Sequence, residues 1–159
     1  METASLNKNM ERGKTPIPKS AYKFINPVIK LILRSPLHRL LSHAMMILNF
    51  KGRKSGKTIS VPVGYTRRGN SLVVFTFGNW WKNLQNNAEV SIRLQGKDIK
   101  GRANIVNDLY TVGEMVNGVF EARGEEMAKR MGFERIPPGA SVDEIRKKSQ
   151  NLVFIQIDV

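Results

Sequence analysis

The feature that most limits the fold is a series of short β-type runs that begins at residue 45 and is interrupted by glycine-containing turns. In residues 59–65, apolar side chains alternate with small or polar ones, which is typical of a strand with two different faces. Similar runs predict strands at residues 45–50, 71–77, 89–94, 99–106 and 152–157. Six strands with helices only between and around them predict a small antiparallel barrel of the α+β class. The first three strands are expected to form a meander.

Helical patterns flank these strands. Residues 21–41 have apolar side chains at helical spacing, with Pro27 expected in a first turn and Pro36 expected to begin a second short helix. Asn79 is expected to cap a short helix that carries Trp80 and Trp81. Asp108 is expected to cap a long helix, and Ser141 with Glu144 forms a capping-box pattern for another.

The length of 159 residues is that of one domain. Residues 1–19 are polar and are expected to form a flexible N-terminal arm, and residues 20–159 are expected to form the single barrel domain. The chain has no cysteine, which excludes disulfides and cysteine nucleophiles and favours a cytoplasmic location. Its two histidines lack metal-ligand spacing, so no metal is predicted, and no apolar run is long enough to span a bilayer.

The charge is unevenly distributed. Between residues 12 and 88 there are 14 Lys and Arg and no Asp or Glu, whereas residues 89–159 hold 11 of each sign, so the first 88 residues account for the whole net charge of +13. This asymmetry indicates an anionic partner: a phosphorylated cofactor, an anionic membrane or a nucleic acid. A solvated cationic face without a partner is the alternative. No nucleic-acid recognition motif is present, so no specific nucleic-acid partner is predicted.

Residues 21–41 combine apolar spacing with four basic side chains. A helix of this kind packs over a barrel mouth or lies on an anionic membrane. Packing is the favoured interpretation, and peripheral contact with the inner face of the membrane through residues 21–41 is the alternative.

The densest group of cations is the turn Gly52-Arg53-Lys54-Ser55-Gly56-Lys57. It is not a P-loop, because only three residues separate its glycines and a strand-like run with Pro62 follows it. Two glycines would allow successive backbone amides to point at one anion, while the cations and the Ser55 hydroxyl bind its oxygens. A solvated cationic hairpin turn is the alternative.

Four segments carry a family resemblance. They are Ser35-Pro36-Leu37-His38-Arg39, the turn at 52–57, Val61-Pro62-Val63-Gly64-Tyr65 and Trp80-Trp81-Lys82-Asn83-Leu84, in that order. Over residues 34–107 the chain resembles the deazaflavin (F420)-dependent nitroreductase family of split β-barrel oxidoreductases related to flavin-binding proteins. The resemblance implies that Arg53, Lys54, Ser55, Gly56 and Lys57 hold the phosphate and acidic tail of coenzyme F420. It also implies that Val61, Pro62, Val63, Trp80 and Asn83 border the cofactor.

The function expected from this resemblance is hydride transfer from reduced deazaflavin to an electron-poor, apolar acceptor such as a quinone, an enone or a nitro compound. The cofactor carries the electrons in such chemistry, which agrees with the lack of an acid–base pair. No catalytic residue is assigned, and Tyr110 is a candidate proton donor. A barrel loaded with FMN, haem or a fatty acid is the alternative, and a homodimer is expected because split barrels often bury their open side.

Overall fold

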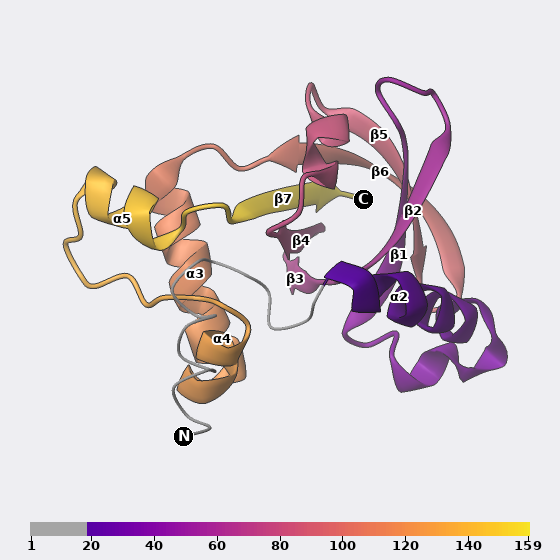
Figure 1. Cartoon of the computed structure of the whole chain (residues 1–159), viewed down its shortest axis with the longest axis horizontal. Coiled ribbons are helices and arrows are strands. Elements are labelled where there is room, and N and C mark those ends of the chain that lie inside the picture. Colours follow the sequence, from indigo (N-terminus) through magenta and orange to yellow (C-terminus); the bar gives the residue numbers. More distant parts are fainter. Residues whose placement is uncertain (1–18) are drawn as a thin grey trace. The chain divides into compact units, whose positions relative to one another are not determined.

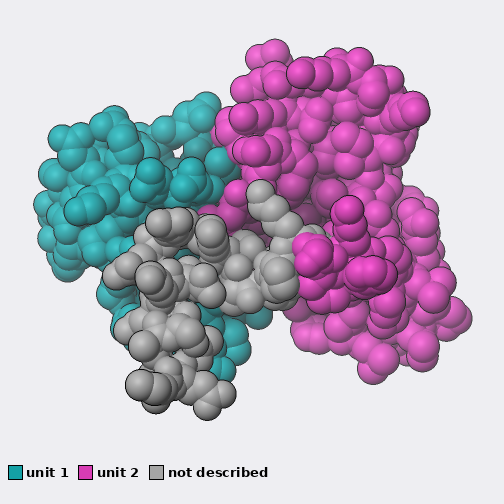
Figure 2. Space-filling view, in the orientation of Figure 1, with its two compact units in different colours: residues 1–18, 106–153 teal, residues 19–105, 154–159 magenta. Residues whose placement is uncertain are grey.

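The computed structural model describes residues 19–159. These residues form two compact units (Figure 2). Residues 19–105 and 154–159 make up the sheet unit, and residues 106–153 make up the helical unit. The predicted arm at residues 1–19 falls almost wholly outside the described residues, and Lys19 begins a helix. One barrel domain over residues 20–159 stays a prediction.

The sheet unit contains a curled antiparallel sheet of seven strands within the described chain (Figure 1). The strand order is β2-β1-β5-β6-β7-β4-β3. The strands are β1 (Met45–Lys51), β2 (Thr58–Gly64), β3 (Thr66–Arg68), β4 (Ser71–Thr76), β5 (Ala88–Leu94), β6 (Lys97–Ile105) and β7 (Val153–Asp158). The prediction of an α+β split barrel is confirmed. Of the seven described strands, only the three-residue β3 was not predicted.

The predicted meander is wrong, because β2 and β4 lie far apart in the strand order. The chain leaves the β1–β2 ladder at Tyr65, which is buried and donates its hydroxyl proton to the carbonyl oxygen of Ser42. It then forms β3, which pairs with β4 at the other end of the sheet. The free edge of β1 is occupied by β5, so Leu48 lies opposite Ile92. Local alternation identifies strands, but it carries no information about which strands pair.

Side chains on one face of the sheet form the core. Leu48 and Ile92 are fully buried, as are Ala103 and Ile157 where β6 pairs with β7. The opposite face carries polar side chains at alternate positions, for example Asn49 opposite Ser91. The second side is polar along β5 and β6, as in an antiparallel sheet with one solvated face, whereas Ile47 of β1 and Phe154 of β7 are buried on it.

Two helical segments precede the sheet. Helix α2 (Lys19–Arg34) packs against β1 and β2, and the short 3₁₀ helix η1 (Pro36–Leu40) follows it. Pro36 begins η1 as expected, with the Ser35 hydroxyl accepting from the amide of Leu37. Pro27 was expected in a first turn but lies in the interior of α2, because the helix begins eight residues earlier. None of the described helices is long and apolar enough to cross a bilayer.

A second 3₁₀ helix, η2 (Trp80–Leu84), lies between β4 and β5. Its presence was predicted, and Asn79 occupies the N-cap position, but the Asn79 side chain makes no capping hydrogen bond. Leu84, the last residue of η2, is fully buried.

The helical unit consists of α3 (Leu109–Arg123), α4 (Glu125–Arg130) and α5 (Val142–Lys148). Both predicted caps are confirmed, since Asp108 accepts from the Thr111 amide and Ser141 accepts from the Glu144 amide. Within the unit, the Asn117 side chain holds both backbone groups of Ile136, at 2.9 and 3.0 Å.

Candidate functional site

The basic turn is the hairpin connection between β1 and β2. Lys51 and Thr58 are the last paired residues, and the Lys51 ammonium donates to the Thr58 hydroxyl at 3.1 Å. The Gly52 amide donates to the Lys57 carbonyl at 2.8 Å, and Gly56 adopts a φ of +64°, which glycine accommodates without strain. A strand follows the turn, so the rejection of a P-loop is confirmed.

The cationic side chains of the turn face solvent. Arg53, Lys54 and Lys57 are exposed, and none of them takes part in an ion pair within residues 19–159. The Arg53 guanidinium donates to the side-chain oxygen of Gln85 at 3.3 Å. The Ser55 hydroxyl accepts from the Lys57 amide at 3.3 Å, which leaves its own proton for another acceptor. This donor set suits an anion with several oxygens.

The backbone amides of the turn are arranged differently from the prediction. The amides of Gly52 and Gly56 donate to backbone carbonyls, the amide of Lys57 donates to the Ser55 hydroxyl, and the amide of Arg53 donates to Asn83. These four donors are used inside the protein. The prediction that successive amides surround one anion is therefore wrong for them, and side chains carry the anion-binding capacity of the turn.

Asn83 fixes the turn to η2. Its side-chain oxygen accepts from the Arg53 amide at 3.0 Å, and its side-chain nitrogen donates to the Trp80 carbonyl at 2.9 Å. The Trp80 indole stacks on Phe50 of β1, with ring centroids 5.6 Å apart and planes inclined by 22°. Sequence reasoning placed Asn83 and Trp80 at a cofactor surface but missed this bracing role, since nothing local in the sequence indicates it.

The segment Val61–Pro62–Val63 lies in β2. Pro62 pairs with Ile47, and strand alternation places its ring on the opposite face from Val61 and Val63. Val63 is buried, and the other two are half-buried. β2 is an outer strand in the described sheet, so part of its backbone has no ladder partner. Contact with a cofactor through this backbone stays a prediction.

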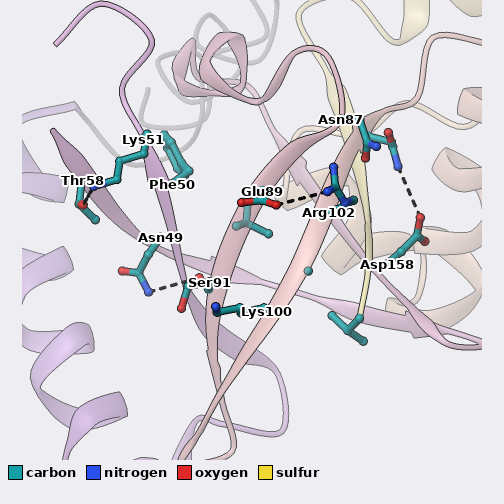
Figure 3. A pocket seen from close by; sticks show the side chains of 14 residues that line it. Asn49, Phe50, Lys51, Thr58, Asn87, Glu89, Ser91, Lys100, Arg102 and Asp158 are labelled. Carbon is teal, nitrogen blue, oxygen red and sulfur yellow. Dashed lines mark hydrogen bonds and ion pairs between the residues drawn. The ribbon is translucent and has the colours of Figure 1, made fainter. Parts of the chain in front are cut away.

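A groove of about 770 Å³ lies on the polar face of the sheet, next to the turn (Figure 3). It begins at Phe50, Lys51 and Thr58 and crosses β5 and β6 to reach Asp158 of β7. Sequence reasoning did not identify it, although polar residues at every second position of β5 and β6 are its signal. The other residues that line it are Asn49, Asn87, Glu89, Val90, Ser91, Lys100, Gly101, Arg102, Asn104 and Val159.

The charges of this groove are partly compensated. Arg102 pairs with Glu89 at 3.2 Å. Asp158 accepts from Ser71, Gln156 and Asn104, and these hydrogen bonds lower its pKa below the ordinary value. The Lys100 ammonium makes no ion pair with any described residue. The groove therefore retains cationic character close to the basic turn.

Tyr110 is the remaining sequence candidate. It is the second residue of α3, in the helical unit, and its side chain is exposed. A role as proton donor stays a prediction.

Residues 35–112 match the model of a family described as F420H(2)-dependent quinone reductase. No curated protein matches the chain. Among solved structures, the chain is similar to an F420-H2 dependent reductase, FDR-A, with 17% identity over 71% of this chain and 93% of that one, at a TM-score of 0.46.

Two further likenesses are to a FAD-binding protein from Mesorhizobium loti and to HutZ, a heme storage protein from Vibrio cholerae. The first is 17% identical over 84% of this chain and 88% of that one, with a TM-score of 0.48. The second is 13% identical over 83% and 87%, with a TM-score of 0.49. TM-scores below 0.5 imply nothing about what this chain binds. The family match covers the basic turn, β2 and η2, so residues 35–112 are similar to the F420H(2)-dependent quinone reductases, a family of oxidoreductases that use coenzyme F420.

Proposed function

We propose that this reductase binds the phosphate and acidic tail of reduced coenzyme F420 on the turn at residues 52–57 and transfers a hydride to an electron-poor, apolar acceptor such as a quinone, an enone or a nitro compound. The observation that carries the proposal is the braced basic turn. Three cations and a hydroxyl protrude from a hairpin that Asn83 ties to η2.

The residues of the turn fit an anionic group. Cations without acidic partners form charge-assisted hydrogen bonds with phosphate or carboxylate oxygens at little cost, because no existing ion pair must break. The Arg53 guanidinium gives a forked donor, and Lys54 and Lys57 give point charges on either side of Ser55. The brace from Asn83 keeps the turn ordered before binding, which lowers the entropy lost on association.

The cofactor supplies the hydride, so the protein needs only to bind, orient and exclude water. The half-buried Trp80 ring, which stacks on the buried Phe50, provides an apolar surface beside the turn. The outer backbone of β2 would provide amide and carbonyl groups on the neighbouring side, to which Pro62 contributes only its carbonyl. Lys51 and Lys100 in the adjoining groove would attract further carboxylates of the acidic tail.

The first experiment measures binding. Purified protein is titrated into oxidised and reduced F420, and quenching of cofactor fluorescence gives the dissociation constant. Binding at low micromolar concentration supports the proposal, whereas no binding at tens of micromolar contradicts it. A flavin, haem or fatty acid that copurifies with the protein and resists exchange for F420 would favour the alternative binding barrel.

The second experiment concerns the acceptor. Under anaerobic conditions, oxidation of reduced F420 is followed with menadione, cyclohexenone and a nitroimidazole as separate acceptors. Enzyme-dependent oxidation by at least one of them supports the proposed acceptor class. If the cofactor binds but none of the three is reduced, the acceptor part of the proposal is wrong while the cofactor part stands. The predicted homodimer and cytoplasmic location stay predictions.

A further inference from the structure

Helix α2 presents apolar side chains on two opposite sides. Leu33 is 2% exposed, on the side that packs toward β1 and β2. Phe24, Val28 and Leu31 are 79%, 57% and 71% exposed. At about 100° per residue, these three side chains fall within roughly 60° of one another around the helix axis, and Leu33 points about 180° away from Phe24. Packing on the sheet therefore accounts for one side of the helix and leaves the other apolar side facing outward.

Exposed apolar side chains also follow the helix in the sequence. Leu37 and Leu40 of η1 are also exposed, and η1 packs against α2. Scattered exposed apolar residues are ordinary, but six large ones within 17 consecutive residues, Ile25 included, are unusual for a solvated surface. A surface of this kind indicates an apolar partner.

The charges beside this surface identify the chemistry of the partner. Lys23, Lys30 and Arg34 fall within about 40° of one another, on a flank roughly 100° from the apolar line. None of the three makes an ion pair with any described residue. There is no Asp or Glu between residues 12 and 88. An apolar stripe with an uncompensated cationic flank is complementary to a layer that is apolar inside and anionic at its surface.

A second copy of the chain is a poorer partner for the same face. Two such faces packed antiparallel would bring Lys23, Lys30 and Arg34 close to their own counterparts, and residues 12–88 hold no acidic side chain to compensate them. Like charges brought together in this way oppose association.

We propose that α2 and η1 form a docking surface for anionic phospholipid. Phe24, Val28 and Leu31 enter the boundary between headgroups and acyl chains, and the cationic flank contacts lipid phosphates. The helix lies in the membrane plane, since no described helix is able to span the bilayer. The proposal is independent of the cofactor and of the acceptor.

The test uses the full chain and sedimentation with two kinds of vesicle, phosphatidylcholine alone and a mixture of phosphatidylglycerol with phosphatidylcholine. Binding is expected only to the anionic mixture and is expected to weaken with salt. Exchange of the cationic flank by K23Q, K30Q and R34Q together should reduce partitioning by up to about 100-fold. Exchange of the apolar stripe by F24S, V28S and L31S together should reduce it by at least about tenfold.

A matched control removes three exposed cations elsewhere in the same unit. R67Q, R68Q and K97Q together change the net charge by the same amount, on β3 and at the start of β6. This variant should keep most of its affinity for the anionic vesicles. Equal losses in the two charge variants would show attraction by net charge alone and would overturn the proposal. Circular dichroism of each variant verifies that it is folded.

A site-specific measurement is available because the natural chain has no cysteine. V28C and R67C are each labelled with a fluorophore that responds to polarity. Anionic vesicles should shift the emission of the Val28 position to the blue and leave that of the Arg67 position unchanged. No shift at the Val28 position, or light scattering without lipid that shows a dimer abolished by the apolar-stripe variant, would overturn the proposal in favour of a protein partner.

Discussion

The side-chain oxygen of Asn83 accepts a hydrogen bond from the backbone amide of Arg53 at 3.0 Å, across a sequence separation of 30 residues. The same side chain donates to the Trp80 carbonyl, so one amide links the basic turn, η2 and the ring that stacks on Phe50. The charge of the turn is a local property, but its order depends on this distant residue.

The brace predicts the effect of Asn83→Ala. Loss of both hydrogen bonds should release the turn and weaken F420 binding by about 1 kcal/mol, near fivefold, because the loop must then be ordered on binding. Fluorescence quenching measures this change. Asn117→Ala is a matched control, since Asn117 makes the same kind of double bridge in the helical unit. It should lower stability without changing cofactor affinity, and equal affinity losses in both variants would contradict the bracing role.

Arg53 is expected to contact the anionic part of the cofactor directly. Arg53→Ala keeps the backbone amide that Asn83 binds but removes the guanidinium, and it should reduce affinity by about 1–3 kcal/mol. Arg67→Ala, which removes an exposed cation from β3, is the control and should bind normally. An unchanged dissociation constant for Arg53→Ala would move the anion site away from this turn.

The stacked pair predicts different outcomes for two Trp80 variants. Trp80→Ala removes the ring contact with Phe50 and should lower the free energy of unfolding by about 1–3 kcal/mol, while Trp80→Phe should keep much of the contact. Urea unfolding followed by circular dichroism compares them. Equal stability of the alanine variant and the natural chain would show that the stack contributes nothing to folding.

Gly101 predicts a packing limit in the sheet. A Cβ atom at this position would lie 2.7 Å from the Asp158 carbonyl oxygen and 3.0 Å from Cγ2 of Ile157. Because the first neighbour is backbone, Gly101→Ala should destabilise the chain by about 1–3 kcal/mol. Gly118→Ala in α3 would meet no atom within 4 Å other than its chain neighbours and the backbone of its own helix, and it should be neutral or stabilising, since alanine favours helix. Urea midpoints test both, and the opposite order of stability would refute the prediction.

Asp158 predicts how stability depends on pH. Hydrogen bonds, first from Ser71 and then from Gln156, lower its pKa below the ordinary 3.8. A group with a lowered pKa in the folded state stabilises the protein above the unfolded-state pKa, and this contribution is lost as the pH falls through the folded-state pKa. Below about pH 4, stability should therefore fall less steeply in Asp158→Asn than in the natural chain. Urea unfolding of both proteins at neutral and at acidic pH measures this. An equal loss of unfolding free energy with falling pH in the two proteins would show that the carboxylate is not responsible.

Some features of the site follow from sequence and others do not. The turn at 52–57, the strand around Pro62 and the short helix at Trp80 were all predicted, because turn residues, alternation and aromatic pairs are local signals. The pairing of β4 with β3 and its separation from β2 were not, because the change of direction at Tyr65 depends on a hydroxyl that binds Ser42, 23 residues away. The groove was missed for a similar reason, since Lys51, Lys100 and Asp158 come from three strands that only the sheet brings together.

The sequence by itself determined the α+β class, six of the seven described strands, the basic turn and the resemblance to a deazaflavin-dependent family. Each of these depends on short segments whose residues are close together along the chain. Only the tertiary structure decided how Asn83 braces Arg53, which turn amides are already used, and that α2 exposes Phe24 while it buries Leu33. The physical reason is that hydrogen-bond partners and burial depend on which distant segments meet, and the hydrophobic pattern of a single segment leaves that choice open.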